Sequence, residues 1–145
     1  MPTPPAIRPL ALAIVRRDDD LLVFEGRDRT KAETYYRPLG GGIEFGETAV
    51  EALRRELREE LAVELSDLEL LGVLENIFEY ENQPGHEIVF LYRAEIVDRT
   101  LYERDEVGVV LDQGSPVSWR PLREFAEGRL TLYPAGLAEL LSAQV

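Results

Sequence analysis

The 145-residue sequence contains no cysteine. A chain without cysteine forms no disulfide, offers no thiolate nucleophile and provides no sulfur ligand for a metal. It also contains no apolar run near the roughly 18 residues that a membrane-spanning helix needs. These absences exclude a disulfide scaffold, thiol chemistry and a transmembrane protein from the interpretation.

A recognisable export signal is absent as well. The first ten residues, MPTPPAIRPL, are interrupted by prolines where a signal peptide would need a charged segment followed by an apolar one. We therefore expect no export and no membrane partner. With no disulfide framework, a cytoplasmic location is the default expectation.

Positive charge is scarce too. Lysine and arginine together number 16 against 28 aspartates and glutamates, which gives a formal net charge of -12. A groove for a nucleic-acid backbone needs clustered basic residues, so no nucleic-acid partner is expected. Small phosphorylated ligands remain possible, because a divalent cation inverts the local sign of a carboxylate cluster.

What is present indicates a globular domain of mixed α/β class. A hydrophobic content of 45% with 30% charged residues is typical of one, and the length suits a single domain over residues 1–145. Four apolar runs predict strands, the first two joined as a hairpin by residues 18–20: 7–17, 21–27, 70–80 and 86–96. The remaining segments predict loops at 28–36 and 98–108, a glycine loop around a short strand at 37–47, a last strand at 116–122 and a closing helix at 134–143.

A long helix is predicted in the middle of the chain, from Thr48 onward. Thr48 and Glu51 have the spacing of a capping box, in which each side chain binds the exposed N–H of the other residue. Apolar residues then recur at helical spacing and predict the face that packs on the core: Val50, Leu53, Leu57 and Leu61.

Three glutamates of this helix lie close together. At about 100° per residue, Glu56, Glu59 and Glu60 fall within an arc of roughly 100° beside the apolar face. Carboxylates so close repel one another. Either Arg55 and Arg58 screen them on a solvated face, or a hard divalent cation such as Mg²⁺ or Mn²⁺ binds between them.

The residues upstream decide between these alternatives. Gly41 is followed after five residues by Glu47, and after seven more by the run RELREELAV from Arg55 to Val63. This pattern resembles the signature of the Nudix hydrolases, which is Gly, five residues, Glu, seven residues, Arg-Glu-aliphatic-any-Glu-Glu-aliphatic-Gly-aliphatic. The one departure is Ala62 in place of the last glycine, which removes no ligand and costs stability if its φ is positive.

The resemblance implies a fold, an activity and a set of roles. The fold would be an α/β/α sandwich with a mixed sheet, and the activity would be metal-dependent hydrolysis of a diphosphate linkage in a nucleoside diphosphate derivative. Arg55 and Glu47 would brace the loop on the helix, and Gly41 and Gly42 would let the backbone approach metal and phosphates. The ligands for Mg²⁺ or Mn²⁺ would be the side chains of Glu56, Glu59 and Glu60 and the carbonyl of Gly40.

The catalytic base is assigned less directly. A glutamate that is not saturated by metal can take the proton of the attacking water, and Glu56 is the first candidate. In some branches of the family the base comes from a loop beyond the helix. Glu103 and Glu106 are the loop carboxylates that fit, and the alternative explanation for them is an ordinary solvated acidic loop.

Substrate contacts are expected from residues on both sides of the signature. Arg27 and Arg37 belong to a local basic cluster that could bind phosphates, and Tyr36 could stack on a base or pack in the core. Tyr80 lies seventeen residues beyond Val63, which resembles the dinucleoside polyphosphate branch of the family. The sequence therefore favours nucleotide polyphosphates as the substrates.

Two other functions stay open. One is hydrolysis of ADP-ribose or a nucleotide sugar, although the proline-marked pattern of the ADP-ribose branch is missing. Another is a catalytically inactive nucleotide-binding regulator, which would be expected to have lost a helix glutamate. The sequence also leaves open whether the chain forms a homodimer.

Overall fold

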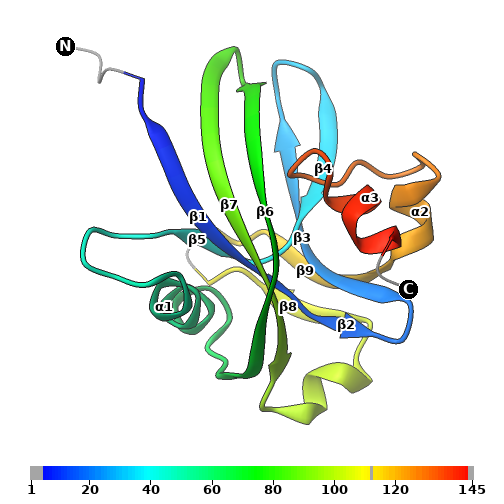
Figure 1. The fold of residues 1–145 in the computed structure, drawn as a ribbon. Coiled ribbons are helices and arrows are strands. Elements are labelled where there is room, and N and C mark those ends of the chain that lie inside the picture. The colour runs from blue at the N-terminus through cyan, green and yellow to red at the C-terminus, as the bar shows by residue number, and fades with distance from the viewer. Residues whose placement is uncertain (1–4, 112, 144–145) are drawn as a thin grey trace.

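The computed structural model describes residues 5–111 and 113–143, and it shows the predicted mixed α/β fold (Figure 1). The strands are β1 (Ile7–Ile14), β2 (Arg16–Arg17), β3 (Asp20–Asp28), β4 (Glu33–Arg37), β5 (Gly40–Gly42), β6 (Leu65–Tyr80), β7 (Gln83–Ile96), β8 (Glu106–Val109) and β9 (Pro116–Pro121). The helices are α1 (Ala49–Leu61), α2 (Leu122–Ala126), α3 (Leu137–Ser142) and a short 3₁₀ helix (Arg99–Glu103).

The strands of the described residues form two sheets. The first has the order β5-β1-β7-β6, and it is mixed because β1 runs parallel to β7 while the other pairs are antiparallel. The second has the order β2-β3-β9-β8, and β4 pairs with β3 beside this path. Consecutive strands form the antiparallel pairs β2–β3, β3–β4, β6–β7 and β8–β9, whereas the pairs β1–β7 and β3–β9 join strands that are distant in the chain.

The strands β1, β3 and β7 contribute side chains to two hydrophobic cores. Along β1, Ala11 and Ala13 pack in the core beneath α1, whereas Leu10 and Leu12 pack in the core beneath α2 and α3. This alternation follows from the period of two along a strand. Helices therefore cover the strand layer from both sides, which is the expected α/β/α sandwich (Figure 1).

Helix α1 forms as its sequence predicts. The Thr48 hydroxyl accepts from the Glu51 N–H at 3.1 Å, and the Glu51 carboxylate accepts from the Thr48 N–H at 3.0 Å. Of the predicted core face, Leu53 and Leu57 are fully buried, whereas Val50 and Leu61 are partly exposed and Ala52 is buried beside them. Ala62, after the last turn, has φ 55° and ψ 40°, so it occupies the left-handed conformation that costs alanine more than glycine.

Several predicted boundaries are wrong. The strand predicted at 7–17 is broken at Val15: only β2 forms the hairpin with β3, and β1 joins β5 and β7 in the other sheet. An apolar run shows that a strand is covered on both faces, but it does not reveal the strand's partners.

Two predicted loops contain regular structure. The loop predicted at 28–36 includes β4, whose polar residues Glu33 and Thr34 lie at the outer part of the sheet. The loop predicted at 98–108 includes the 3₁₀ helix capped by Asp98 and the start of β8. The closing helix begins at Leu137 rather than at Pro134. In the described ranges, no helix is long and apolar enough to cross a membrane.

Candidate functional site

A cavity of about 610 Å³ runs along the face of the first sheet that α3 also covers. At one end it is lined by Gly40, Gly41, Glu56 and Glu60, and at the other by aromatic side chains that include Phe78 and Tyr80. The length of the cavity follows from the strand register. Leu12 pairs with both Gly40 and Leu91, so Gly40 lies at the position of Leu91 along β7. Phe78 pairs with Gly85 of the same strand. Six residues of β7 separate these positions, which corresponds to about 20 Å. The cavity is long enough for an extended ligand.

The glutamate end is formed where α1 packs against the glycine strand β5. The Gly40 N–H donates to the Glu60 carboxylate at 2.9 Å, and Glu60 is only 7% exposed. Gly41 leaves space for Glu56, since a Cβ on Gly41 would lie 2.6 Å from the Glu56 carboxyl carbon. The absence of side chains on β5 therefore allows two carboxylates of one helical turn to lie against the strand.

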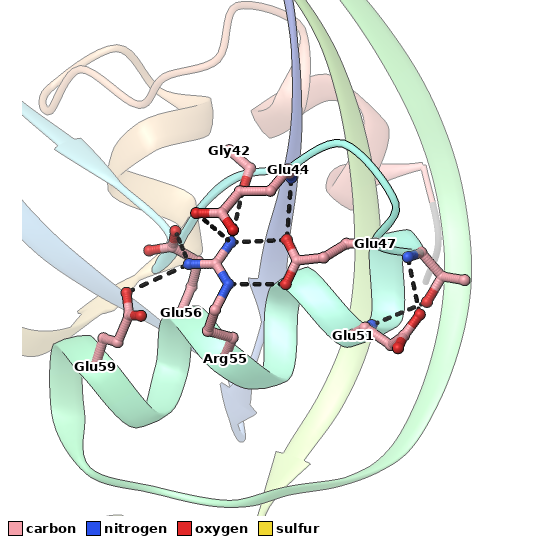
Figure 2. A network of polar contacts seen from close by, with 8 residues as sticks. Gly42, Glu44, Glu47, Glu51, Arg55, Glu56 and Glu59 are labelled. Atoms are coloured by element: carbon pink, nitrogen blue, oxygen red, sulfur yellow. Dashed lines mark hydrogen bonds and ion pairs between the residues drawn. The ribbon is translucent and has the colours of Figure 1, made fainter.

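Arg55 organises the outer face of the same helix (Figure 2). Its guanidinium donates to both oxygens of Glu47 at 2.8 and 2.9 Å and to the Gly42 carbonyl at 3.0 Å. It also donates to Glu56 at 2.9 Å and to Glu59 at 3.3 Å. The Glu47 hydrogen bonds raise the pKa of Arg55. Arg55 thus fixes the loop between β5 and α1 on the helix and orients the Glu56 carboxylate.

This bracing should make stability depend on acid pH. Hydrogen bonds from Arg55, with one from the Glu44 N–H, lower the pKa of Glu47 from 4.5 to about 2. A carboxyl whose pKa is lower when folded stabilises the protein above its unfolded pKa, and this contribution is lost as the pH falls. We expect Glu47→Gln to lower the free energy of unfolding at pH 7, and the difference from wild type to shrink between pH 4.5 and 2.

Urea unfolding at a series of pH values measures this difference. Glu44→Gln is the control, because the Glu44 carboxylate lies 3.9 Å from Arg55 and is 71% exposed. A difference between wild type and Glu47→Gln that stays constant down to pH 2 would contradict the bracing role.

The carboxylates at the glycine strand fit a hard divalent cation. Their donor atoms are oxygens, which Mg²⁺ and Mn²⁺ prefer, and Glu56 and Glu60 line the same cavity. Glu59 does not line it: its side chain is 58% exposed and bound to Arg55. Among residues 5–111 and 113–143, no three acidic or histidine side chains are already gathered as a metal cluster. A cation held by all three glutamates would therefore require Glu59 to turn away from Arg55.

Arg37 lies next to the glutamate end with an unused donor. Its Nη2 is 3.5 Å from the Gly40 carbonyl, and its guanidinium stacks over Phe24 with 5.1 Å to the ring centroid. Burial lowers the pKa of Arg37, whereas the negative charges of Glu60 and Glu87 oppose that shift. Its Nε is buried and has no hydrogen-bond partner in the described part of the chain. Because this donor is shielded from solvent, an acceptor of a ligand would reach it only after a movement of the Arg37 side chain.

A polar row crosses the middle of the cavity. Arg8 of β1 pairs with Glu87 of β7, which pairs in turn with Asn76 of β6, so the three side chains project from the same face. Asn76 is 8% exposed, and its Nδ2 is the second buried donor without a partner among the described residues. Burial raises the pKa of Glu87. Such unpaired buried donors are costly unless a ligand or water satisfies them.

The structure brings together only part of the set that the sequence indicated. The predicted site residues that line the cavity are Gly40, Gly41, Glu56, Glu60, Arg37 and Tyr80. Those that do not line it are Glu59, Arg27, Tyr36, Glu103 and Glu106.

Each residue outside the cavity has another environment. Tyr36 is 6% exposed in the core beneath α2, and its hydroxyl donates to Glu25. Arg27 donates to Thr34 on the outside of the second sheet. Glu103 ends the 3₁₀ helix and Glu106 starts β8 opposite Ser118, so neither side chain is placed with Glu56.

The sequence interpretation missed several cavity residues, including Arg8, Asn76 and Glu87. The signal for Asn76 was a polar residue at an inward position of an apolar strand, two residues after Leu74. Arg8 and Glu87 carried no such signal, because their proximity depends on strand register between distant segments.

Comparison with known proteins gives one family match over most of the chain. A family model described as the NUDIX domain matches residues 7–141. The NAD-capped RNA hydrolase NudC of Pseudomonas aeruginosa strain LESB58 is 28% identical over 103 residues, which are 70% of this chain and 34% of that protein. The chain therefore spans about a third or less of the curated relatives that it matches.

Solved structures show the same fold. A Nudix hydrolase from Nitrosomonas europaea superposes with a TM-score of 0.69 at 18% identity, covering 96% of this chain and 88% of that one. A MutT Nudix hydrolase from Burkholderia pseudomallei gives 0.61 at 23% identity, covering 81% and 85%. At these identities the likeness concerns the arrangement of helices and strands.

Proposed function

The chain belongs to the Nudix family, and from this premise we propose that it hydrolyses a diphosphate linkage in a nucleoside diphosphate derivative with the help of Mg²⁺ or Mn²⁺. The observation that carries the proposal is the pair of carboxylates at the glycine strand. Glu56 and Glu60 lie at one end of a cavity that also contains Arg37 and ends in aromatic rings. Anion-binding, metal-binding and base-binding groups therefore share one cavity.

Each residue of the glutamate end has a task in this proposal. Glu56 and Glu60 would hold the cation, joined by Glu59 and the Gly40 carbonyl. A bound cation would neutralise charge on phosphate oxygens and make a hydroxide nucleophile available near neutral pH. Arg37, which lines the cavity, would donate to a phosphate oxygen, and a small movement of its side chain would bring the unpaired Nε into reach.

Proton transfer is assigned to Glu56. Its carboxylate lines the cavity, and Arg55 holds one of its oxygens at 2.9 Å, so the other oxygen would serve the attacking water when Glu59, Glu60 and the Gly40 carbonyl carry the cation. A glutamate in this position can accept the proton as water attacks phosphorus. Arg55 would only orient the Glu56 carboxylate, since its other donors bind Glu47, Glu59 and the Gly42 carbonyl.

Among substrates we place dinucleoside polyphosphates and nucleoside triphosphates first. Tyr80 supports this choice, because its distance beyond the signature resembles the dinucleoside polyphosphate branch and its side chain lines the cavity. The aromatic end also accommodates the base of ADP-ribose or a nucleotide sugar. A panel of these four substrate classes, assayed for phosphate-containing products with Mg²⁺ and with Mn²⁺, tests the proposal. A binding protein without activity would show turnover with none of them.

The Glu59→Gln variant tests the metal ligands directly. We expect it to raise the Mg²⁺ concentration for half-maximal turnover by about tenfold, since one of three carboxylate ligands becomes neutral. Calorimetric titration with Mn²⁺ should show a matching loss of affinity. Glu64→Gln is the charge-matched control, because Glu64 follows α1, binds Arg58 and is 54% exposed. Equal turnover and equal Mn²⁺ affinity in wild type and Glu59→Gln would refute the assignment.

A further inference from the structure

The aromatic end of the cavity is built by two hairpins whose tips lie side by side (Figure 1). Hairpin β3–β4 contributes Tyr35, and hairpin β6–β7 contributes Phe78 and Tyr80. Tyr35 and Tyr80 meet edge to face, with 6.0 Å between ring centroids. The distance between the hairpin tips therefore decides how far apart the rings stand.

Glycines of the partner strands fix the rings in place. Tyr35 is paired with Gly26, where a Cβ would lie 2.4 Å from the Tyr35 ring. Phe78 is paired with Gly85, where a Cβ would lie 2.4 Å from the Phe78 ring. Each ring therefore lies across the backbone of its own hairpin, and it moves with that hairpin rather than independently.

A buried carboxylate joins the two tips. Asp28 is 1% exposed, and its Oδ1 accepts from the N–H groups of Thr30 and Lys31 at 3.0 and 3.1 Å, within its own hairpin. Its Oδ2 accepts from the N–H of Glu81, in the turn of the other hairpin, at 3.1 Å. Burial alone would raise the pKa of Asp28, but the three backbone donors outweigh it and the pKa is lowered.

Other contacts between the tips support this one. The Lys31 ammonium donates to the Glu79 carbonyl at 2.8 Å, and the Tyr80 hydroxyl donates to the Arg27 carbonyl at 3.3 Å. These contacts involve exposed groups, whereas the Asp28 contact is partly buried and its carboxylate is almost fully shielded from solvent. Charged hydrogen bonds are stronger when they are shielded from water.

We propose that Asp28 is a positioning residue that binds the Glu81 amide across the hairpin tips and thereby sets the spacing of the aromatic end for the planar base of a nucleotide. The inference rests on the proposed function and deepens it, because it assigns the far end of the same cavity to the base. Asp28 does not touch the base; it acts through Tyr35, Phe78 and Tyr80.

The Asp28→Asn substitution separates the two halves of this contact. An asparagine keeps Oδ1 for the Thr30 and Lys31 amides, but it places an NH₂ donor against the Glu81 N–H. The turn of β3–β4 is therefore retained, while the bond between hairpins is lost. Asp98→Asn is the matched control, since Asp98 also accepts hydrogen bonds from its own loop, at Thr100, and lies outside the cavity lining.

Binding without metal tests the proposal independently of turnover. Calorimetry should compare AMP, GMP, CMP and UMP with ribose 5-phosphate, which has no base. We expect wild type and Asp98→Asn to bind at least one nucleotide more tightly than ribose 5-phosphate. Asp28→Asn should weaken binding of that nucleotide about tenfold, the size expected for loss of one charged hydrogen bond, and leave binding of ribose 5-phosphate unchanged. Hydrogen exchange at the Glu81 amide should accelerate.

Steady-state kinetics provide a second test of the role of Asp28. With the nucleotide that is turned over best, Asp28→Asn should raise KM about tenfold and change kcat less than twofold. Lys31→Met should weaken nucleotide binding by a smaller factor than Asp28→Asn, and it replaces Asp28→Asn if that variant does not fold.

The proposal is overturned if no nucleotide binds better than ribose 5-phosphate, or if the difference in affinity between nucleotide and ribose 5-phosphate is the same in the variant as in wild type. Absence of turnover with the expected binding pattern would reject the proposed function and leave this inference standing.

Discussion

Replacing Glu56 with glutamine is expected to lower kcat by about 10³-fold, which lies within the range for loss of a general base. The Glu56 carboxylate lies at the glycine strand, lines the cavity and is oriented by Arg55 at 2.9 Å. Glutamine has nearly the same shape but neither accepts a proton from water nor binds a cation as strongly. The measurement is steady-state turnover at saturating Mg²⁺, with the melting temperature recorded for each variant.

The control for this prediction is a glutamate-to-glutamine substitution outside the cavity. Glu64→Gln should have turnover close to wild type, since Glu64 binds Arg58 at the surface. A Glu56→Gln enzyme that folds and retains more than about a tenth of wild-type turnover would argue against Glu56 as the base. In that case the proton acceptor would have to be sought elsewhere in the cavity.

The Gly41→Ala variant is expected to lose about 10²-fold in kcat without a matching loss of stability, because a shift near 1 Å in a reacting group is enough for this. The added Cβ would lie 2.6, 2.7 and 2.8 Å from the three atoms of the Glu56 carboxyl group. These atoms are the end of a flexible side chain, so the carboxylate moves and the backbone does not. The loss should therefore appear in turnover rather than in folding.

Gly72→Ala provides the comparison for Gly41→Ala. It also adds one methyl group to a strand, and its nearest neighbour is the Leu140 side chain at 3.2 Å. Its turnover should match wild type. Urea unfolding should place both alanine variants within about 1 kcal/mol of wild type, as for most substitutions that leave the core intact. Wild-type turnover in Gly41→Ala would show that the position of the Glu56 carboxylate is not critical.

The glutamate end of the site follows from local sequence. Hydrogen bonds between residues four apart fix the geometry of a helix, so the spacing of Glu56, Glu59 and Glu60 determines where they stand around its axis. The capping box of Thr48 and Glu51 formed as predicted for the same reason. Even here, tertiary contacts decided that Glu60 is buried against Gly40 while Glu59 remains exposed beside Arg55.

The rest of the site depends on strands that are distant in the chain. Arg8, Glu87 and Asn76 form a row only because β1 joins β7 in parallel and β7 pairs with β6 in one particular register. A shift of one residue would turn these side chains to the other face. The apolar run of β1 did not reveal its partners, and the hairpin predicted for it formed with β2 alone.

The sequence by itself determined the family signature, the central helix and the carboxylates along it, because a helix is specified by residues that are neighbours in the chain. The tertiary structure decided which of those carboxylates reach the cavity, and it placed Asp28 against the amide of Glu81 across 53 residues. Glu103 and Glu106, plausible from their charge, lie outside the cavity lining, because Glu103 ends the 3₁₀ helix and Glu106 pairs with β9 in the second sheet. Contacts between distant residues arise from strand register and packing, which a single sequence does not encode in any local pattern.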